Sequence, residues 1–277
     1  MTLTRTEVAE LLERHGLEPS RALGQNFVVD PNTVRRIARL AGVGPGDRVV
    51  EIGAGLGSLT LALAETGADV VAVEIDRYVL PALRAVVAER APGVRVVEGD
   101  AMALDWDAVL APAPGAWSLV ANLPYNVATP LVLDVLDDVP AVGSLFVMVQ
   151  REAGERLAAG PGSRAYGIPS VKVAYHATAE VTGIVAPTVF VPRPRVESAL
   201  VRIVRRPAPA PAADPDRLFA LVRAGFGQRR KMLRRALAGQ VSTEQFAAAG
   251  VRPEARAEQL AIDDWGRLAV AAPAVTS

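Results

Sequence analysis

Cysteine is absent from the 277 residues, and histidine occurs only twice, as His15 and His176. The lack of cysteine excludes disulfides and thiolate metal ligands, which is typical of proteins from a reducing cytosol. Two histidines far apart in the sequence provide little material for a zinc site or for a histidine general base. We therefore expect no bound metal.

Long hydrophobic runs are also missing. The longest apolar stretch, residues 142–149, is too short to span a bilayer, for which about 20 residues are needed. The first fifteen residues carry charges throughout, unlike a secretory signal: Arg5, Glu7, Glu10, Glu13 and Arg14. We expect a cytoplasmic protein with no membrane association.

The charges of the whole chain cancel, with 30 basic and 30 acidic residues. They are unevenly distributed, because residues 193–235, the basic block, contain twelve Lys and Arg against three acids, a local net charge of +9. One basic block in a neutral chain is typical of a polyanion-binding region, although a solvated basic helix face has the same composition.

Short apolar strands alternate with helical segments through most of the chain. The strands are expected at 49–52, 70–74, 94–97, 117–121 and 144–149, and the helices at 4–15, 30–41, 59–64 and 79–88. This alternation predicts an α/β fold with a parallel sheet covered by helices on both faces. Residues 171–175 and 199–204 are further strand candidates.

The run of alternating proline and alanine at 207–213 is the clearest linker. Beyond it the pattern predicts only helices, at 218–226, 230–237, 243–248 and 262–270. We therefore expect two domains, residues 1–206 with an N-terminal helical arm and residues 207–277 as a small helical domain.

Glycines follow the first strand in the order Gly53-Ala54-Gly55-Leu56-Gly57, preceded by Glu51. Glycine permits positive φ angles and a close approach of the backbone to a ligand. A dinucleotide fingerprint would require a third glycine at Ser58, so a dehydrogenase is disfavoured. The spacing suits a cofactor with an amino-acid moiety and no pyrophosphate, whereas the alternative is a tight turn that binds nothing.

Acidic residues end the next two strands. Glu74 is placed to accept hydrogen bonds from ribose hydroxyls, and Asp100 from an adenine amino group. Either acid alone would be an ordinary helix cap or a solvated turn. Ligands in open α/β sheets bind at the carboxyl ends of the strands. The glycine loop, Glu74 and Asp100 follow three successive strands, and we therefore expect them to line one crevice.

Asn122-Leu123-Pro124-Tyr125 follows the fourth strand. A planar exocyclic amine is a weak nucleophile, and its methylation is helped by two acceptors that hold its hydrogens. The Asn122 side-chain oxygen and the Leu123 carbonyl are the candidates, since Pro124 lacks an N–H and fixes the turn. Tyr125 offers a face on which a flipped base could stack. The alternative is an ordinary β-turn with a core tyrosine.

The chain resembles the ribosomal RNA adenine N6,N6-dimethyltransferase family, and most closely its small-subunit branch. The matching segments lie in family order along nearly the whole chain: 23–27 (LGQNF), 51–57 (EIGAGLG), Glu74, Gly99-Asp100, 122–126 (NLPYN), 149–152 (VQRE), 190–198 (FVPRPRVES) and 228–233 (QRRKML). The resemblance implies a Rossmann-like class I methyltransferase sheet and S-adenosylmethionine as the methyl donor.

The resemblance also implies roles for individual residues. The cofactor would be held by Gln25, Asn26, Val28, Gly53, Gly55, Glu74, Asp100, Ala101 and Asn122. The reaction would depend on Asn122, Leu123, Pro124, Tyr125 and Phe190, with Phe190 opposite Tyr125 across the target adenine. Arg229, Arg230 and Lys231 would contact RNA phosphates.

The small-subunit branch dimethylates two adjacent adenines in a hairpin near the 3′ end of 16S rRNA. The resemblance therefore implies that the substrate is 16S rRNA in a 30S subunit or its precursor, and we expect a monomeric enzyme of ribosome biogenesis. The alternatives are a 23S rRNA adenine methyltransferase that confers macrolide-type resistance, and an assembly factor that acts mainly by binding. A DNA adenine methyltransferase would share the same chemistry.

Overall fold

The computed structural model describes residues 2–20, 23–110, 115–208, 211 and 213–273. The chain forms two compact units: Met1–Gly154 with Glu180–Arg205, and Glu155–Ala179 with Arg206–Ser277. The unit changes after Arg205, and the sequence analysis placed the domain boundary after residue 206. Residues 155–179, which we assigned to the first domain, belong instead to the second unit. Three residues of the expected linker (209, 210 and 212) lie outside the described residues.

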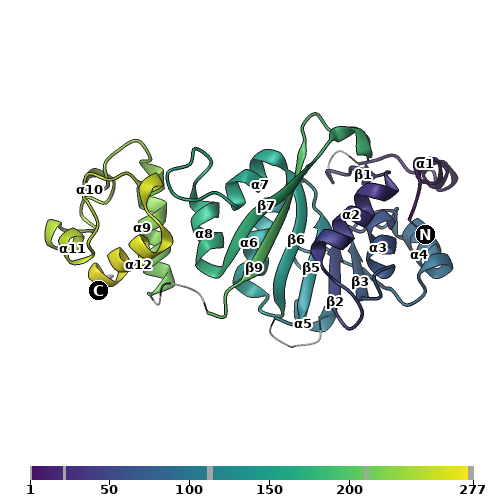
Figure 1. The fold of residues 1–277 in the computed structure, drawn as a ribbon, viewed down its shortest axis with the longest axis horizontal. Helices are drawn as coiled ribbons and strands as arrows, with labels where there is room; N and C mark the ends of the chain where they lie inside the picture. Colours follow the sequence, from purple (N-terminus) through teal and green to yellow (C-terminus); the bar gives the residue numbers. More distant parts are fainter. Residues whose placement is uncertain (1, 21–22, 111–114, 209–210, 212, 274–277) are drawn as a thin grey trace. The chain divides into compact units, whose positions relative to one another are not determined.

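The first unit is built on a seven-stranded sheet with the order β4-β3-β2-β5-β6-β9-β7 (Figure 1). Its strands are β2 (Arg48–Ile52), β3 (Asp69–Glu74), β4 (Arg95–Glu98), β5 (Trp117–Asn122), β6 (Val142–Gln150), β7 (Ala177–Val185) and β9 (Ser198–Arg205). The first five are mutually parallel where they pair, and β9 runs antiparallel to β6. Parallel strands place their carboxyl ends at one edge, and this edge positions the site.

The central strands are apolar because both faces of the sheet are covered. Val49, Val70 and Val120 contribute to one hydrophobic cluster together with α2 (Pro31–Ala41) and α3 (Ser58–Ala64). Asp30 begins α2 by accepting hydrogen bonds from backbone N–H groups, and Gly42 ends it in the left-handed conformation. The remaining helices of the first unit are α4 (Leu80–Arg90), α5 (Trp106–Val109) and α6 (Ala128–Asp138), and α7 (Arg151–Leu157) contains the change to the second unit after Gly154.

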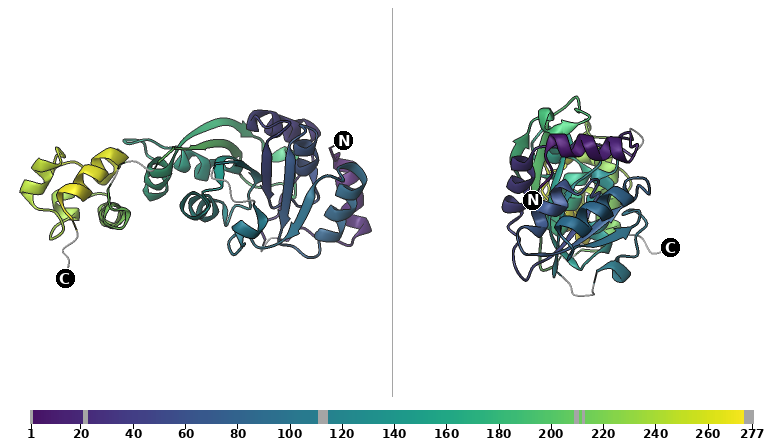
Figure 2. Two further views of the ribbon diagram at one scale, coloured as in Figure 1. Left: turned by 90° about the horizontal axis from the view of Figure 1, so that it is seen from below. Right: turned by 90° about the vertical axis from the view of Figure 1, so that its right-hand side faces the viewer.

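The N-terminal arm contains α1 (Arg5–Arg14) and the short strand β1 (Phe27–Val28). A capping box at Thr4 and Glu7 starts α1, and Glu7 also accepts a hydrogen bond from Arg90 of α4 at 2.7 Å. The ion pair and the capping bonds lower the pKa of Glu7 to about 2, the backbone hydrogen bond at Thr4 being the largest cause. Figure 2 gives two further views of the arm at the purple end of the chain.

Strand β1 pairs with β8 (Phe190–Val191), which follows the short 3-10 helix η1 (Pro187–Val189). The pairing is antiparallel and sets Val28 opposite Phe190. This small sheet was not expected from the sequence, since two-residue strands carry no periodicity. It joins segments more than 160 residues apart in the chain, which only the tertiary structure reveals.

The end of α6 is fixed by Arg205, the last residue of β9. Its guanidinium donates hydrogen bonds to the backbone carbonyls of Val135, Leu136, Val139 and Val142. Arginine supplies five donors in a planar fork, so one side chain can satisfy several orphan carbonyls at a helix end. Arg205 therefore has a structural role, although it belongs to the basic block.

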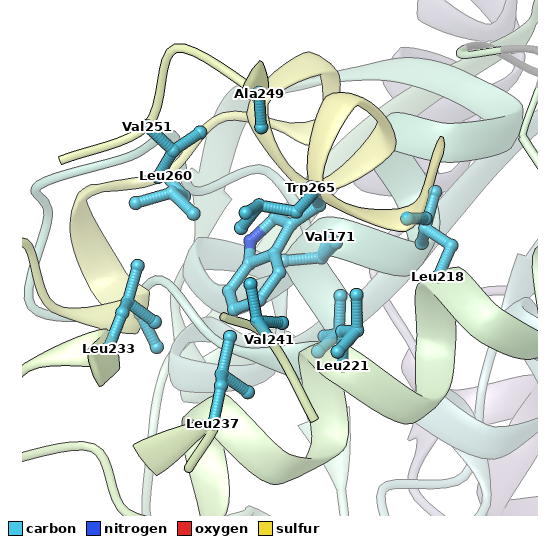
Figure 3. Close-up of a cluster of buried hydrophobic side chains, with 14 of the residues drawn as sticks. Val171, Leu218, Leu221, Leu233, Leu237, Val241, Ala249, Val251, Leu260 and Trp265 are labelled. Carbon is cyan, nitrogen blue, oxygen red and sulfur yellow. The ribbon is translucent and has the colours of Figure 1, made fainter. Parts of the chain in front are cut away.

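The second unit contains α8 (Ile168–His176), α9 (Pro215–Gly227), α10 (Leu233–Ala236), α11 (Thr243–Ala248), the 3-10 helix η2 (Ala257–Gln259) and α12 (Ile262–Ala271). Figure 3 shows Trp265 at the centre of its core, surrounded by labelled side chains that include Leu221, Leu237 and Leu260. Trp265 is fully buried. Pro211 of the linker packs against Gly266 of α12, where an added Cβ would collide with the proline ring.

Two predictions for this unit were wrong. Residues 171–175 form a helix, not a strand, because Val171 and Tyr175 pack into the helical core and tertiary burial overrides β-branched propensity. The helix expected at 230–237 is confined to α10, since Leu233 N–H bonds to the Ala255 carbonyl and Arg234 N–H to the Pro253 carbonyl. Arg230 and Lys231 therefore lie in a turn between α9 and α10.

None of the helices in the described part of the chain is both long enough and apolar enough to cross a membrane.

Candidate functional site

Two adjoining pockets lie at the carboxyl edge of the parallel strands. The first is lined by the glycine loop after β2, by Glu74 of β3, by Asn122 at the end of β5 and by the segment 23–28 of the arm. The second is lined by Asp100 and Ala101 after β4 and by Val127. Both pockets have Leu23, Gly53, Ile75 and Pro124 in their linings, so they are immediate neighbours, and we refer to the two together as the cleft. The three strand ends singled out in the sequence thus converge.

The loop between β2 and α3 requires its glycines. Gly53, Gly55 and Gly57 have φ angles of +71°, +57° and +91°, a region that side chains with a Cβ rarely adopt. A Cβ on Gly55 would lie 3.0 Å from two atoms of the Phe27 ring. The absence of side chains at these glycines therefore leaves the loop backbone accessible where Phe27 of the arm packs beside the pocket.

Glu74 is almost completely buried and is held by backbone donors. Its carboxylate accepts hydrogen bonds from the N–H groups of Gly55 (2.7 Å), Ile75 (3.0 Å) and Asp76 (2.9 Å). Burial raises the pKa of Glu74, and these three hydrogen bonds oppose the rise. The carboxylate thus joins the glycine loop to the end of β3 while lining the first pocket.

Glu51 provides a second carboxyl group in the same pocket. It is 1% exposed and accepts a hydrogen bond from the Thr60 hydroxyl at 2.5 Å. Burial raises the pKa of Glu51 to about 8, and the nearby charge of Glu74 adds to the rise, whereas the bond from Thr60 opposes it. The pocket is therefore able to accommodate a cationic group, which would favour the ionised carboxylate.

Asp100 lies at the mouth of the second pocket, and its side chain is exposed. One carboxylate oxygen accepts the Met102 N–H at 2.9 Å, which makes a turn after β4. Gly99 precedes it because a Cβ there would lie 2.7 Å from Leu104. Ala101 lines the same pocket.

The loop after β5 has a fixed side-chain orientation. The Asn122 side-chain NH2 donates to the Asn26 backbone carbonyl at 3.0 Å, which places the Asn122 oxygen on the other edge of the amide. The Pro124 carbonyl accepts hydrogen bonds from the N–H groups of Val127 and Ala128 and so begins α6. The start of α6 thus engages the Pro124 carbonyl and not the preceding carbonyl of Leu123 in the bonds that the described residues form.

Tyr125 lines the first pocket, and its hydroxyl lies 2.8 Å from the Ser198 hydroxyl at the start of β9. Burial raises the pKa of Tyr125, with the hydrogen bond to Ser198 opposing the rise. The bond fixes the far end of the ring. Phe190 is placed differently from our expectation: it is 2% exposed, it packs in the core with Val28 and Val34, and it is not among the described residues that line the cleft.

The arm contributes Gln25 and Asn26 to the first pocket. The Gln25 side chain donates to Asp76 at 2.7 Å and accepts from the Ser20 N–H at 2.7 Å, so it ties the arm to the end of β3. Asn26 donates through its side chain to the Gly24 carbonyl. The sequence patterns gave no role to Asp76, Thr60 or Ser198, because their hydrogen-bond partners lie on other elements of the fold and follow from no local pattern.

The three basic residues expected at an RNA interface, all in the second unit, differ in their surroundings. Arg229 donates to Glu258 at 2.8 Å and to the Arg164 carbonyl at 3.0 Å. Arg230 and Lys231 are exposed and form no ion pair in the part of the chain that the structure describes. Arg229 therefore supports the fold of this unit, whereas its two neighbours are available to a ligand.

Solved structures with the same fold include two that cover most of this chain. A dimethyladenosine transferase from Plasmodium falciparum has a TM-score of 0.71 at 22% identity, covering 87% of this chain and 95% of that one. The 23S rRNA methyltransferase ErmE has a TM-score of 0.70 at 25% identity, covering 89% of this chain and 99% of that one. The fold is thus that of class I S-adenosylmethionine-dependent methyltransferases.

Similarity in sequence is closer still. A protein from Kineococcus radiotolerans named ribosomal RNA small subunit methyltransferase A is 50% identical over 98% of this chain and 92% of its own length. A protein of the same name from Thermobifida fusca is 49% identical over 96% of this chain and 95% of its own. The model of the ribosomal RNA adenine dimethylase family matches residues 18–272. The glycine loop, the acids at the strand ends and the loop that begins at Asn122 lie together in the cleft. The chain therefore belongs to the ribosomal RNA adenine dimethylase family of S-adenosylmethionine-dependent methyltransferases.

Proposed function

We propose that this enzyme dimethylates the N6 amines of two adjacent adenines in a hairpin near the 3′ end of 16S rRNA, during small-subunit ribosome biogenesis in the cytoplasm. The observation that carries the proposal is the fixed amide of Asn122 beside the glycine loop in one cleft. The two relatives near 50% identity are both named for the small subunit, which favours 16S over 23S rRNA.

The cleft fits S-adenosylmethionine. Gly53 and Gly55 leave backbone exposed where a Cβ would strain the loop or meet Phe27, and buried carboxyl groups suit the cationic and hydroxyl-bearing parts of the molecule. We assign the amino-acid part to the region of Gly53 and Glu51, the ribose to Glu74 and the adenine to Asp100 with Ala101. The other cofactor contacts proposed are Gln25, Asn26, Val28 and Asn122.

When bound, S-adenosylmethionine supplies a methyl group on a sulfonium whose leaving group is a neutral thioether. The protein's part is to position the amine. The Asn122 side-chain oxygen and the Leu123 carbonyl would hold the amine hydrogens and so orient the nitrogen lone pair for methyl transfer. A strong base is not required, because the amine proton is lost after the N–C bond has formed.

Tyr125 supplies the stacking face for the target base. Its ring lines the pocket and is steadied by Ser198, and base–aromatic stacking contributes on the order of 1–3 kcal/mol. Phe190 lies behind the wall of the pocket, paired through β8 with Val28 of β1. We propose that Phe190 acts by holding this wall.

The second unit is proposed to bind RNA through Arg230 and Lys231, with Arg229 bracing the turn that presents them. Phosphates attract such exposed cations, and the attraction weakens with salt. We propose that the enzyme acts as a monomer on the 30S subunit or its precursor.

The test of the function uses undermethylated 30S and 50S particles with labelled S-adenosylmethionine. We expect label in 30S particles, mapped to adjacent N6,N6-dimethyladenines near the 3′ end of 16S rRNA. Label in 23S rRNA would support the resistance-type activity instead. Tight 30S binding without label would support an assembly factor that acts by binding.

Asn122→Ala tests the amine-holding role. We expect the rate of methyl transfer at saturating substrates to fall by about 10²-fold or more, as when one oriented polar group is lost from an active site. Cofactor affinity, measured by calorimetry, should change only a few-fold, since Asn122 is one of several proposed cofactor contacts and its bond to Asn26 is one of several that hold the arm. The matched control is Asn32→Ala, an exposed asparagine of α2. Retention of the full rate would remove Asn122 from the mechanism.

A further inference from the structure

The segment 192–197 (PRPRVE) connects β8 to β9 and has no role in the function proposed above. We propose that its two arginines, Arg193 and Arg195, clamp the phosphates that flank the target adenine. This inference rests on the proposed RNA substrate and adds positioning residues in the first unit, separate from the basic turn of the second.

Both ends of the segment are anchored at residues of the reaction pocket. Before it, Val191 pairs with Phe27, which lines the pocket. After it, Ser198 is fully buried and bonds to the Tyr125 hydroxyl at 2.8 Å. An extended chain advances about 3.3–3.6 Å per residue, so the Cα of Arg195 lies at most about 11 Å from that of Ser198. Arg195 is thus tied to the residue that bonds to Tyr125, and Arg193 lies two residues from the Val191 that pairs with Phe27.

The charge of the segment is arranged for an anion. Its one acid, Glu197, is bound by Arg151 at 2.8 Å, and the Glu197 carbonyl accepts the Arg151 N–H at 3.0 Å. Arg193 and Arg195 are exposed and have no ion pair among the described residues. With Glu197 neutralised by its partner, two guanidinium groups dominate the local field.

The sequence of the segment also limits its motion. Pro192 and Pro194 alternate with the arginines, and each proline fixes its φ angle and removes an N–H donor. A stiff segment presents its charges with less loss of entropy on binding. Guanidinium groups bind phosphate oxygens bidentately, so arginine at both positions suits a phosphodiester strand better than lysine would.

The substrate for the test is an RNA hairpin with the sequence of the 3′-terminal hairpin of 16S rRNA. For the double variant Arg193→Gln/Arg195→Gln we expect the KM for this RNA to rise about tenfold or more. The slope of log K against log salt should fall in magnitude by about 1.4, because each lost contact to a single strand accounts for about 0.7. The Kd for S-adenosylmethionine, measured by calorimetry, should stay within twofold.

Two further variants keep the test decisive. The variant Arg193→Lys/Arg195→Lys retains the charge and should keep the wild-type salt slope. The control variant Arg48→Gln/Arg84→Gln removes two exposed arginines elsewhere in the first unit. A salt slope for the double glutamine variant equal to that of the Arg48/Arg84 control would overturn the clamp. If the double glutamine variant lost as much affinity for S-adenosylmethionine as for the RNA, this result would also overturn the clamp, because the substitutions would then have disturbed the structure of the site. If wild-type enzyme binds the hairpin but labels no particle, the proposed function fails while the salt slope still tests the clamp.

Discussion

Glu51 and Glu74 bring two carboxyl groups into one largely buried pocket, and their environments differ. Glu74 is surrounded by three backbone N–H donors, which stabilise a negative charge. Glu51 has only the Thr60 hydroxyl as its donor, so burial leaves it neutral near pH 7. The proton on Glu51 removes the repulsion that the nearby charge of Glu74 would otherwise exert on it.

This difference predicts a pH dependence of stability. The pKa of Glu51 is 4.5 when unperturbed and about 8 in the folded protein, so between these values the folded state holds the extra proton. The free energy of unfolding should therefore fall as the pH rises from about 4.5 to about 8. Glu51→Gln removes this part of the dependence. At pH 9 the free energy of unfolding of the variant should exceed that of the wild type by a few kcal/mol, since each unit of pKa shift corresponds to about 1.4 kcal/mol.

Urea unfolding of both proteins at pH 5 and pH 9 measures the effect. Glu89→Gln is the matched control, because the Glu89 side chain is 72% exposed and should alter neither value. A stability difference between wild type and Glu51→Gln that is the same at both pH values would contradict the raised pKa.

At the scale of elements, the loop between β2 and α3 determines whether a ligand can reach the backbone. Gly55→Ala should place a methyl group about 3.0 Å from the Phe27 ring and strain a φ angle of +57°. We expect cofactor affinity to fall about tenfold or more, because Phe27 and the arm must shift across the pocket, and the strain itself should cost on the order of 1 kcal/mol.

Gly46→Ala is the matched control for this prediction. Gly46 also has a positive φ angle, +90°, but an added Cβ there meets nothing within 4 Å. The Gly46→Ala variant should lose about as much stability in thermal unfolding as Gly55→Ala, but its cofactor affinity in calorimetry should equal that of the wild type. If both alanine variants bind the cofactor equally well, the contact with Phe27 does not shape the site.

The elements near the site were more predictable than the others. The five parallel strands have apolar runs bounded by glycine or acids, and each was expected within a few residues of its observed position. Strand β7 was missed because Glu180, Thr182 and Gly183 interrupt its pattern. Helix α8 was mistaken for a strand, although Pro169 in its first turn is a helix-start signal.

At the scale of the whole molecule, the basic block separates into two kinds of residue. Arg205, Arg217 and Arg229 donate to backbone carbonyls, and Arg229 also pairs with Glu258, so these side chains hold the fold. Arg230 and Lys231 are exposed. Net charge in the sequence therefore overstated the number of cations available to RNA.

The double variant Arg230→Gln/Lys231→Gln should weaken binding to the 16S hairpin and reduce the magnitude of the salt slope by about 1.4 to 1.8, for two phosphate contacts. Its melting temperature should be unchanged. Arg229→Gln should instead lower the melting temperature, because it breaks the bonds to Glu258 and to the Arg164 carbonyl. Filter binding over a range of salt concentrations and thermal unfolding separate the two effects. A salt slope for Arg230→Gln/Lys231→Gln equal to the wild-type value would leave this turn without a role in RNA binding.

The sequence by itself determined the five parallel strands, the glycine loop and the residues at the strand ends, because these follow from local periodicity and from the common direction of parallel strands. Only the tertiary structure decided which donors each polar group meets: Thr60 for Glu51, Asn26 for Asn122, Ser198 for Tyr125 and Glu258 for Arg229. It also placed Phe190 in the core and moved residues 155–179 to the second unit. Hydrogen-bond partners and burial depend on contacts between distant segments, which no local pattern encodes.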